Sequence, residues 1–322
     1  MSAAAQALRS LLNETDRAAL RAIVPTVTFD EPIAPYTSWK IGGPADAWIV
    51  VETVTQLEAL MTFCGKRRVP WFVLGSGSNL LVGDGGMRGV VMRLAGEFAV
   101  IEVDPSDSLV TVRAGASAGM AALTAKAASA GAAGIGSLAG IPGSVGGSLR
   151  MNAGTDREIG DFVREVYVHS PAKPRAHPVN VQYYYRHTTL ARDAIVGHVV
   201  LGFERGDPEQ VREEMQRRLV RRKQTQPIAL PNAGSCFRNP PGDRAARLIE
   251  AAGAKGWREG GAELSPLHAN FINNRADASA RDVATLLARV RREVARQFGV
   301  ELHLEVHLVG VFIDHDRMKA FG

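Results

Sequence analysis

The spacing of apolar residues predicts a chain in which helices and short strands alternate. Residues 49–51 and 71–74 are continuous apolar runs, and the segment 53–65 between them carries apolar residues at three- and four-residue intervals. That interval places the apolar residues on one face of a helix. The resulting strand–helix–strand order puts the residues after 74 at the carboxyl end of a strand, where α/β sheets commonly bind ligands.

The rest of the chain is predicted to be mostly strands before residue 204 and mostly helices after it. Short segments rich in Val and Ile predict strands at 90–94, 98–103, 109–114, 162–169, 179–185, 194–203 and 301–309. Helical spacing or composition predicts helices at 1–24, 119–130, 208–224, 245–252 and 280–298. In the first of these helices, the side chains expected to pack are Leu8, Leu11, Leu12, Leu20 and Ile23.

The composition is that of a globular protein. The chain has 322 residues, of which 46% are hydrophobic and 22% charged, so it is long enough for two or three domains. Its formal net charge of +5 suits an anionic small substrate or a dinucleotide. Because no helix or loop shows alternating basic and aromatic residues, we expect no nucleic-acid partner.

Several classes of protein and site are not expected. No apolar stretch approaches 18 residues, and charged residues interrupt the first 24, so we expect no membrane span and no signal peptide. Cys64 and Cys236 lie far apart, which predicts no disulfide framework or zinc site and favours a cytoplasmic protein. His303 and His307 lie four apart, but on an expected strand, so we expect no metal site.

Two glycine-rich segments are the main candidates for ligand binding. Gly75, Ser76, Gly77, Ser78 and Asn79 follow the run 71–74 directly, and a second segment spans 134–148. Exposed backbone N–H groups at such loops form sites for phosphate. Two loops of this kind favour a long diphosphate cofactor held from two sides, although each alone is also typical of an ordinary turn.

Three polar residues are candidates for chemistry, each with a plain structural alternative. Glu305 interrupts an apolar alternation, which indicates a functional carboxylate or the wet face of an edge strand. Ser235 lies in a loop bounded by prolines, either as an aimed hydroxyl or as a turn serine. Arg186 follows three tyrosines, which suits a carboxylate-binding guanidinium or a surface arginine. The basic run 217–223 is either a solvated helical face or an anion site.

Taken in order, several motifs between residues 30 and 310 closely resemble the UDP-N-acetylenolpyruvoylglucosamine reductase (MurB) family. They are Tyr36–Trp48, Gly75–Val82, Ala139–Gly154, Tyr185–Thr189, Gly234–Pro240, Gly260–Ile272 and Leu304–Val306. The chain resembles the shorter variant of that family, because 185–204 leaves no room for the long insertion with its tyrosine-bearing loop.

The resemblance implies an α+β fold. An FAD-binding domain of the vanillyl-alcohol-oxidase/PCMH type would consist of two subdomains, 1–95 and 96–205, with the tail strand 301–322 returning to the first. A C-terminal α+β substrate domain would span 206–300. The first glycine loop, Gly75–Asn79, would hold the FAD pyrophosphate. Beside it would lie Gly140, Ile141, Pro142, Gly143, Gly146 and Gly147.

The resemblance also implies the reaction, which belongs to peptidoglycan precursor synthesis. NADPH would reduce FAD, and the reduced flavin would pass hydride to C3 of the enolpyruvyl group of UDP-N-acetylglucosamine enolpyruvate, giving UDP-N-acetylmuramate. Arg186 would stabilise the negative charge on the carboxylate, Glu305 would act there in its protonated form, and Ser235 would give a proton to C2.

The chain departs from the family pattern at two points. Thr155–Glu158 stands where a small or aromatic residue and glycines are usual, and Arg150 where an aliphatic residue is common.

Two other functions are considered. An FAD-dependent oxidase of the same fold would produce hydrogen peroxide and need no NADPH. A silent flavin- or nucleotide-binding regulator should have lost one of Arg186, Ser235 and Glu305, yet all three are present.

Overall fold

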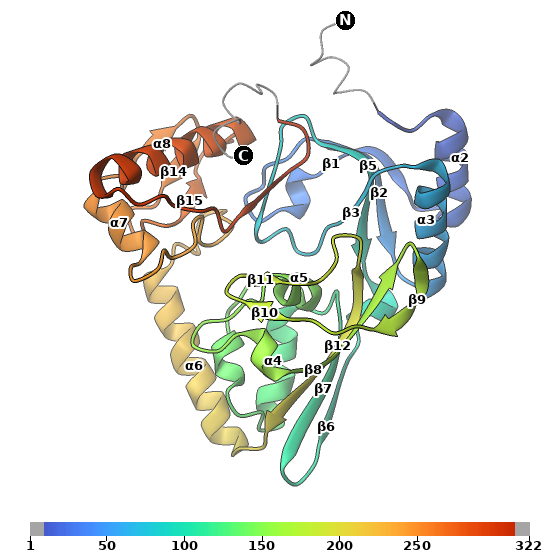
Figure 1. The fold of residues 1–322 in the computed structure, drawn as a ribbon, viewed down its shortest axis with the longest axis horizontal. Helices are drawn as coiled ribbons and strands as arrows, with labels where there is room; N and C mark the ends of the chain where they lie inside the picture. Colours follow the sequence, from blue (N-terminus) through green and yellow to red (C-terminus); the bar gives the residue numbers. More distant parts are fainter. Residues whose placement is uncertain (1–9, 313–322) are drawn as a thin grey trace, which may run out of the picture.

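The computed structural model describes residues 10–312, which form three parts that meet near the centre of the molecule (Figure 1). The N-terminal part, in blue, lies at the upper right, the middle of the chain forms the lower part, and the C-terminal part, in orange and red, lies at the upper left. Helix α6 (Pro208–Thr225) runs from the lower part toward the C-terminal part. None of the helices within 10–312 is both long and apolar enough to cross a membrane.

The first sheet belongs to the N-terminal part and has the strand order β1-β2-β5-β3. Its central strands β2 (Pro44–Val51) and β5 (Met87–Leu94) are parallel, as are β5 and β3 (Trp71–Val73), whereas β1 (Thr28–Pro32) is antiparallel. Helix α3 (Val54–Arg67) connects β2 to β3 and begins with a capping box made by Thr53 and Gln56. The predicted strand–helix–strand unit is therefore confirmed.

The helix predicted over 1–24 is shorter in the structure. Helix α2 covers Glu14–Ile23, and residues 1–9, including Leu8, lie outside the described residues. Asn13 caps the start of the helix: its side chain accepts a hydrogen bond from the Asp16 backbone N–H, so the helix begins at Glu14. The expected packing of Leu11 is wrong, since Leu11 is exposed, whereas Leu12 and Leu20 are buried.

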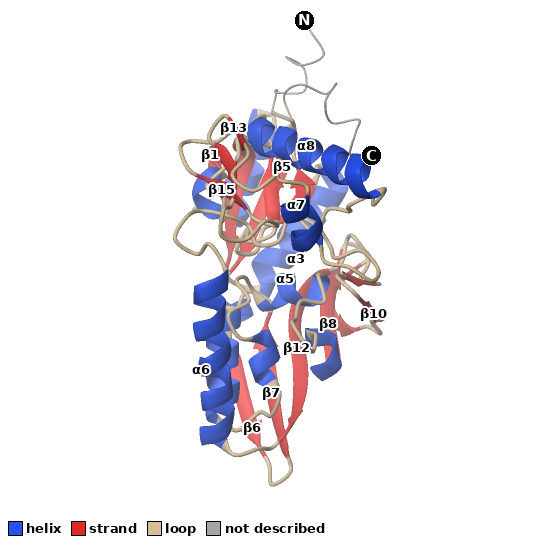
Figure 2. Ribbon diagram, turned by 90° about the vertical axis from the view of Figure 1, so that its left-hand side faces the viewer, coloured by secondary structure: helices blue, strands red, loops and turns tan. Residues whose placement is uncertain are grey.

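The second sheet belongs to the middle of the chain and has the order β6-β7-β12-β8-β9, all antiparallel. Figure 2 shows its long strands standing beside α6. Helix α4 (Met120–Ser129) packs against α6 and against the short helix η3 (Ile135–Leu138). The strands are β6 (Ile101–Pro105), β7 (Leu109–Gly115), β8 (Val163–Ser170), β9 (Lys173–Pro178) and β12 (Ile195–Glu204).

Two predicted strands of this region differ in the structure. The segment predicted as 98–103 begins as the 3-10 helix η2 (Gly96–Ala99), which buries Phe98 in the core. The strand predicted over 179–185 is reduced to β10 (Tyr183–Tyr184), which pairs with β11 (His187–Thr188). Val179 and Val181 pack against the core outside any assigned strand, although the Val179 N–H still donates to the Val166 carbonyl of β8.

The C-terminal part contains helices α7 (Ala245–Ala251) and α8 (Ala280–Phe298), as predicted. Helix α8 begins at a capping box of Ser279 and Asp282 and ends at Gly299, whose φ of +67° is the left-handed conformation that favours glycine. The helix buries the predicted stripe Val283, Leu286, Leu287, Val290 and Val294. It covers a small sheet of β13 (Arg258–Glu259), β14 (Ala262–Leu264) and β15 (Ile272–Asn274), which the sequence did not predict.

The tail strand predicted over 301–309 is strand only at its end. Strand β16 (His307–Val309) pairs in parallel with β4 (Leu80–Val82), immediately after the first glycine loop. Before it, the Glu305 N–H donates to the Cys236 carbonyl, and the Arg238 N–H donates to the His303 carbonyl. Because these backbone groups bond to a loop, residues 301–306 do not extend the strand.

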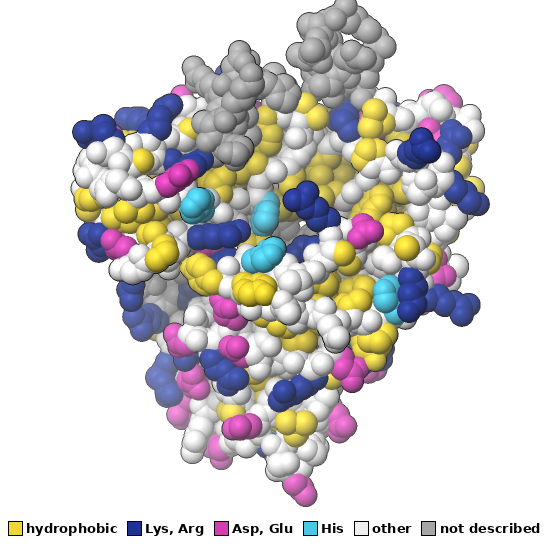
Figure 3. Space-filling model, viewed as in Figure 1, with side chains coloured by type: hydrophobic (Ala, Val, Ile, Leu, Met, Phe, Trp, Pro, Cys, Tyr) yellow, Lys and Arg dark blue, Asp and Glu magenta, His cyan; other side chains and the backbone are white. Residues whose placement is uncertain are grey.

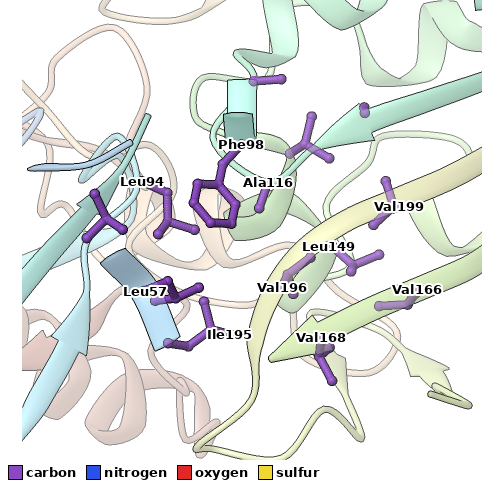
Figure 4. Close-up of a cluster of buried hydrophobic side chains, with 14 of the residues drawn as sticks. Leu57, Leu94, Phe98, Ala116, Leu149, Val166, Val168, Ile195, Val196 and Val199 are labelled. Carbon is purple, nitrogen blue, oxygen red and sulfur yellow. The ribbon is translucent and has the colours of Figure 1, made fainter. Parts of the chain in front are cut away.

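One hydrophobic core joins the first two parts of the chain, and a second joins the C-terminal part to Trp39, Ile41 and Leu81 of the N-terminal part. Figure 4 shows Leu57 and Leu94 of the N-terminal part close to Ile195 of β12. Leu57 and Ile195 are buried, at 0% and 3% exposed. The two sheets are therefore held together by apolar packing, and the division at 95, 205 and 300 stays a prediction.

Candidate active site

A cavity of about 410 Å³, a size common for small-molecule sites, lies where the three parts meet. On the face in Figure 3, His, Lys and Arg side chains gather across the middle of the molecule. The cavity is lined by residues from both glycine-rich segments, from α5 (Val145–Arg150), from the β10–β11 turn, from α6 and from the tail. These include Gly75–Leu80, Ile141–Ser144, Gly147, Ser148, Arg150, Met151, Ala153–Thr155, Arg186, Arg222, Gln226, Ala233–Ser235, Phe271, Glu305, His307 and Val309.

The first glycine loop lines this cavity and packs tightly against Tyr36 and Thr37, which leave no space for a side chain at Gly77. Gly77 has φ +62°, and a Cβ there would come within 2.5 Å of the Tyr36 carbonyl oxygen. A side chain at this position would therefore require the backbone to move. The loop leaves β3 and enters β4, so both of its ends are fixed by strands.

The two glycine-rich segments contact each other. The Ser78 hydroxyl donates to the Pro142 carbonyl at 3.1 Å, and a Cβ at Gly75 would lie 2.6 Å from Ser144 Oγ. A Cβ at Gly143, whose φ is +127°, would lie 2.9 Å from Ser78 Oγ. The absence of side chains at Gly75 and Gly143 thus keeps two backbones together at the cavity wall, which fits a diphosphate-bearing cofactor such as FAD.

The structure places every predicted cofactor residue at this cavity except Gly140 and Gly146. A Cβ at Gly146 would lie 2.9 Å from Ala116 Cβ, so this glycine allows close packing of α5. Gly140 has φ +74°, and a Cβ there would lie 2.9 Å from Arg222 Cδ. Gly140 therefore makes room for Arg222, which itself lines the cavity.

Arg186 projects from the tight turn between β10 and β11, where its φ is +57°. Each of its three nitrogens donates to a different acceptor. Nε bonds Glu305 Oε1 at 3.0 Å, Nη1 bonds Glu158 Oε1 at 2.9 Å, and Nη2 bonds the Gly154 carbonyl at 3.1 Å. The guanidinium also lies 4.8 Å from the Tyr185 ring centre, so its position is strongly determined.

Glu305 is tied into the site by its backbone and its side chain. Its carbonyl accepts from Asn79 Nδ2 at 3.0 Å, and its N–H donates to the Cys236 carbonyl at 2.8 Å. Burial raises the pKa of the Glu305 carboxyl, and the positive charges of Arg186 and Arg238 oppose that rise. The alternative of a fully wet edge-strand face therefore does not hold for this residue.

Ser235 lies in a loop that is fixed by Asn270. The Asn270 side chain accepts from the Phe237 N–H at 2.9 Å and donates to the Phe237 carbonyl at 2.8 Å, and its backbone carbonyl accepts from the Cys236 N–H. Within residues 10–312 the Ser235 hydroxyl has no hydrogen-bond partner, although it lines the cavity. A fixed backbone with a free hydroxyl suits donation to a bound molecule.

Several cavity residues were not predicted individually. Arg222 lies in the basic run 217–223, and burial lowers the pKa of its guanidinium. Arg150, noted as a departure from the family pattern, lines the cavity and donates from Nη1 to the Ala191 carbonyl at 3.2 Å. His307 also lines the cavity, and in the described residues no three His, Cys, Asp or Glu side chains are grouped to hold a metal ion.

Comparison with known proteins agrees over both halves of the chain. The family described as "FAD binding domain" matches residues 45–172, and the "UDP-N-acetylenolpyruvoylglucosamine reductase, C-terminal domain" family matches residues 226–309. The UDP-N-acetylenolpyruvoylglucosamine reductase 2 of Symbiobacterium thermophilum is 43% identical over 314 residues, which cover 96% of this chain and 98% of the relative. The reductase of Moorella thermoacetica is 41% identical and covers 88% and 93%.

The solved structure of the Thermus caldophilus UDP-N-acetylenolpyruvylglucosamine reductase (MurB) agrees with these matches. It superposes with a TM-score of 0.74 at 35% identity and covers 88% of this chain and 97% of the Thermus chain. The predicted α+β fold with an FAD-binding domain is thereby confirmed. The chain belongs to the MurB family of UDP-N-acetylenolpyruvoylglucosamine reductases and is an FAD-dependent oxidoreductase of peptidoglycan synthesis.

Proposed function

We propose that this enzyme reduces UDP-N-acetylglucosamine enolpyruvate to UDP-N-acetylmuramate with NADPH as the electron donor. The main support is that Arg186, Ser235 and Glu305 line one cavity together with both glycine-rich segments. These three side chains come from three distant stretches of the chain. Their convergence beside a diphosphate-binding backbone is what a flavin-dependent reduction of an anionic substrate requires.

The backbone of Gly75–Asn79 and of 141–143 is proposed to hold the FAD diphosphate. Gly75 and Gly143 support this role, because a Cβ at either would crowd the serine hydroxyl of the facing segment, so glycine lets the two segments lie close together. When bound, FAD supplies the hydride that adds to C3 of the enolpyruvyl group.

The three polar residues are proposed to act on the charge and the proton of that addition. Negative charge then develops at C2 and spreads onto the substrate carboxylate. Arg186 donates hydrogen bonds to that carboxylate. Glu305, whose pKa burial raises, is protonated and stabilises the enol form, and the Ser235 hydroxyl delivers the proton to C2.

The UDP portion of the substrate is proposed to contact α6 and the residues after it. Arg222 and Gln226 both line the cavity, and within the described residues the Arg222 guanidinium has no hydrogen-bond or ion-pair partner. A cation of this kind attracts a diphosphate.

We also propose that the reaction takes place in the cytoplasm.

An anaerobic absorbance experiment tests the proposal. The purified protein with FAD should lose its flavin bands on addition of NADPH and regain them on addition of UDP-N-acetylglucosamine enolpyruvate. Bands that return only with oxygen would favour an oxidase instead. Bands that NADH bleaches equally fast would refute the choice of NADPH.

A further inference from the structure

We propose that Glu158 is a positioning residue for the reduction, because it holds the Arg186 guanidinium in the orientation that receives the substrate carboxylate. The inference rests on the proposed function. Glu158 does not line the cavity, so it acts through Arg186 and not on the substrate itself. It belongs to the segment 155–158, where the sequence departs from the family pattern.

The hydrogen bonds of Arg186 define what remains for a substrate. An arginine side chain carries five N–H donors, and three are engaged here by Glu158, Glu305 and the Gly154 carbonyl. Two donors are left, which is the number that a bidentate bond to a carboxylate uses. The acceptors that fix the guanidinium therefore also decide where those two donors point.

Glu158 is a rigid acceptor because both of its oxygens are engaged. Oε1 accepts from Arg186, and Oε2 accepts from Nδ2 of the buried Asn152. Asn152 is itself fixed, since its Oδ1 accepts from the Gly160 N–H at 3.0 Å. The Glu158 N–H donates to Asp161 Oδ2 at 2.9 Å, so the backbone of Glu158 is held as well.

The chemistry of Glu305 explains why a second carboxylate is needed. In the proposed mechanism Glu305 carries a proton, and a neutral carboxyl holds a guanidinium far less strongly than a carboxylate does. Burial and Asp161 raise the pKa of the Glu158 carboxyl as well, but Arg186, at 2.9 Å, opposes the rise, and the ionised Glu158 is then the anion that keeps Arg186 in place. Without it, Arg186 would keep the Gly154 carbonyl and the Tyr185 ring, neither of which is charged.

The test compares Glu158→Gln and Glu158→Ala with Glu165→Gln in stopped-flow measurements of the two half-reactions. Gln keeps the shape of Glu158 and loses its charge. Glu165→Gln makes the same change at an exposed carboxylate of β8, which accepts from the Tyr167 hydroxyl. We expect Glu158→Gln to slow flavin reoxidation by the substrate about 10- to 100-fold, and Glu158→Ala to slow it further. FAD content and reduction by NADPH should stay at wild-type values, and Glu165→Gln should match wild type throughout.

The outcomes separate this inference from the proposed function. If the wild-type flavin is not reoxidised by UDP-N-acetylglucosamine enolpyruvate, the proposed function itself is wrong. If wild type turns over and Glu158→Gln reoxidises at the same rate, the positioning role is refuted. Equal losses in both half-reactions, or a loss of FAD, would show that Glu158 supports only the fold.

Discussion

Asn79 is joined to Glu305 by a side-chain hydrogen bond, and a second bond, to His307, also links the first glycine loop to the tail of the chain. Asn79 Nδ2 donates to the Glu305 carbonyl at 3.0 Å, and the Asn79 carbonyl accepts from the His307 N–H at 3.0 Å. The loop proposed to hold FAD thus also sets the position of the proposed acid. The backbone proposed to hold FAD and the backbone of Glu305 are therefore held at a fixed distance from each other.

Replacing Ser235 by alanine should separate the two half-reactions. Reduction of FAD by NADPH should be nearly unchanged, because it requires no proton from the hydroxyl. Reoxidation by the substrate should slow by about 100- to 10,000-fold, the usual contribution of a positioned proton donor. Stopped-flow absorbance of each half-reaction measures this. Ser129→Ala, which removes a serine hydroxyl from the exposed surface of α4, is the control. Comparable losses in both half-reactions would rule out proton donation by Ser235.

Glu305 should impose a pH dependence on flavin reoxidation. Burial raises the pKa of its carboxyl above the usual value, Glu158 adds to the rise, and Arg186 and Arg238 oppose it. Since the protonated form is proposed to act, the rate should fall as the pH rises through this raised pKa. Glu305→Gln cannot ionise, so that decline should disappear and the rate should be low, by at least about 100-fold, at every pH. A variant that keeps the wild-type pH profile would assign the decline to another group.

The sequence predicted those elements whose information is local. Helix α8 carries its capping box, its apolar stripe and its terminal glycine within 21 residues, and the structure contains all three. Strand β9 was missed because Lys173–Pro178 is polar and contains two prolines, and within residues 10–312 it is an edge strand that pairs only with β8. Residues 301–306 were predicted as strand because apolar and polar residues alternate there. The alternation does not reveal that their backbone bonds to the loop around Cys236 and Arg238, which is distant in the sequence.

For the candidate site, the sequence predicted the residues that lie in motifs but not the contacts between distant residues. Arg186, Ser235 and Glu305 could be named because motifs carry them, and the structure gathers them at one cavity. Glu158 could not be named as a partner of Arg186, since nothing in the sequence indicates which carboxylate faces which guanidinium. Gly140 lies in a motif, yet its contact with Arg222 arises only when α6 packs over that segment.

Replacing Arg222 by alanine should weaken substrate binding more than catalysis. The side chain lines the cavity but lies on α6, and Arg186 remains to meet the substrate carboxylate. We expect KM for the UDP-sugar to rise about 10- to 100-fold, the scale of one charge-assisted hydrogen bond, with kcat changed little. Steady-state kinetics measure both constants. Arg221→Ala, an exposed neighbour on the same helix, is the matched control. If both variants raise KM equally, the effect comes from general charge and not from contact.

Trp39 should be a main determinant of how firmly the C-terminal part is attached. The side chain is fully buried, and its indole Nε1 donates to the Ile272 carbonyl at 2.7 Å. Trp39→Phe leaves that buried carbonyl without its donor, which should lower the free energy of unfolding by about 1–3 kcal/mol. Urea denaturation at a fixed FAD concentration measures the change. Trp257→Phe is the control, because it makes the same change at a side chain that is only partly buried. The Trp257 ring stacks on Arg289, and a phenyl ring keeps part of that contact. An equal loss in the two variants would mean that ring volume, and not the hydrogen bond to Ile272, accounts for the effect.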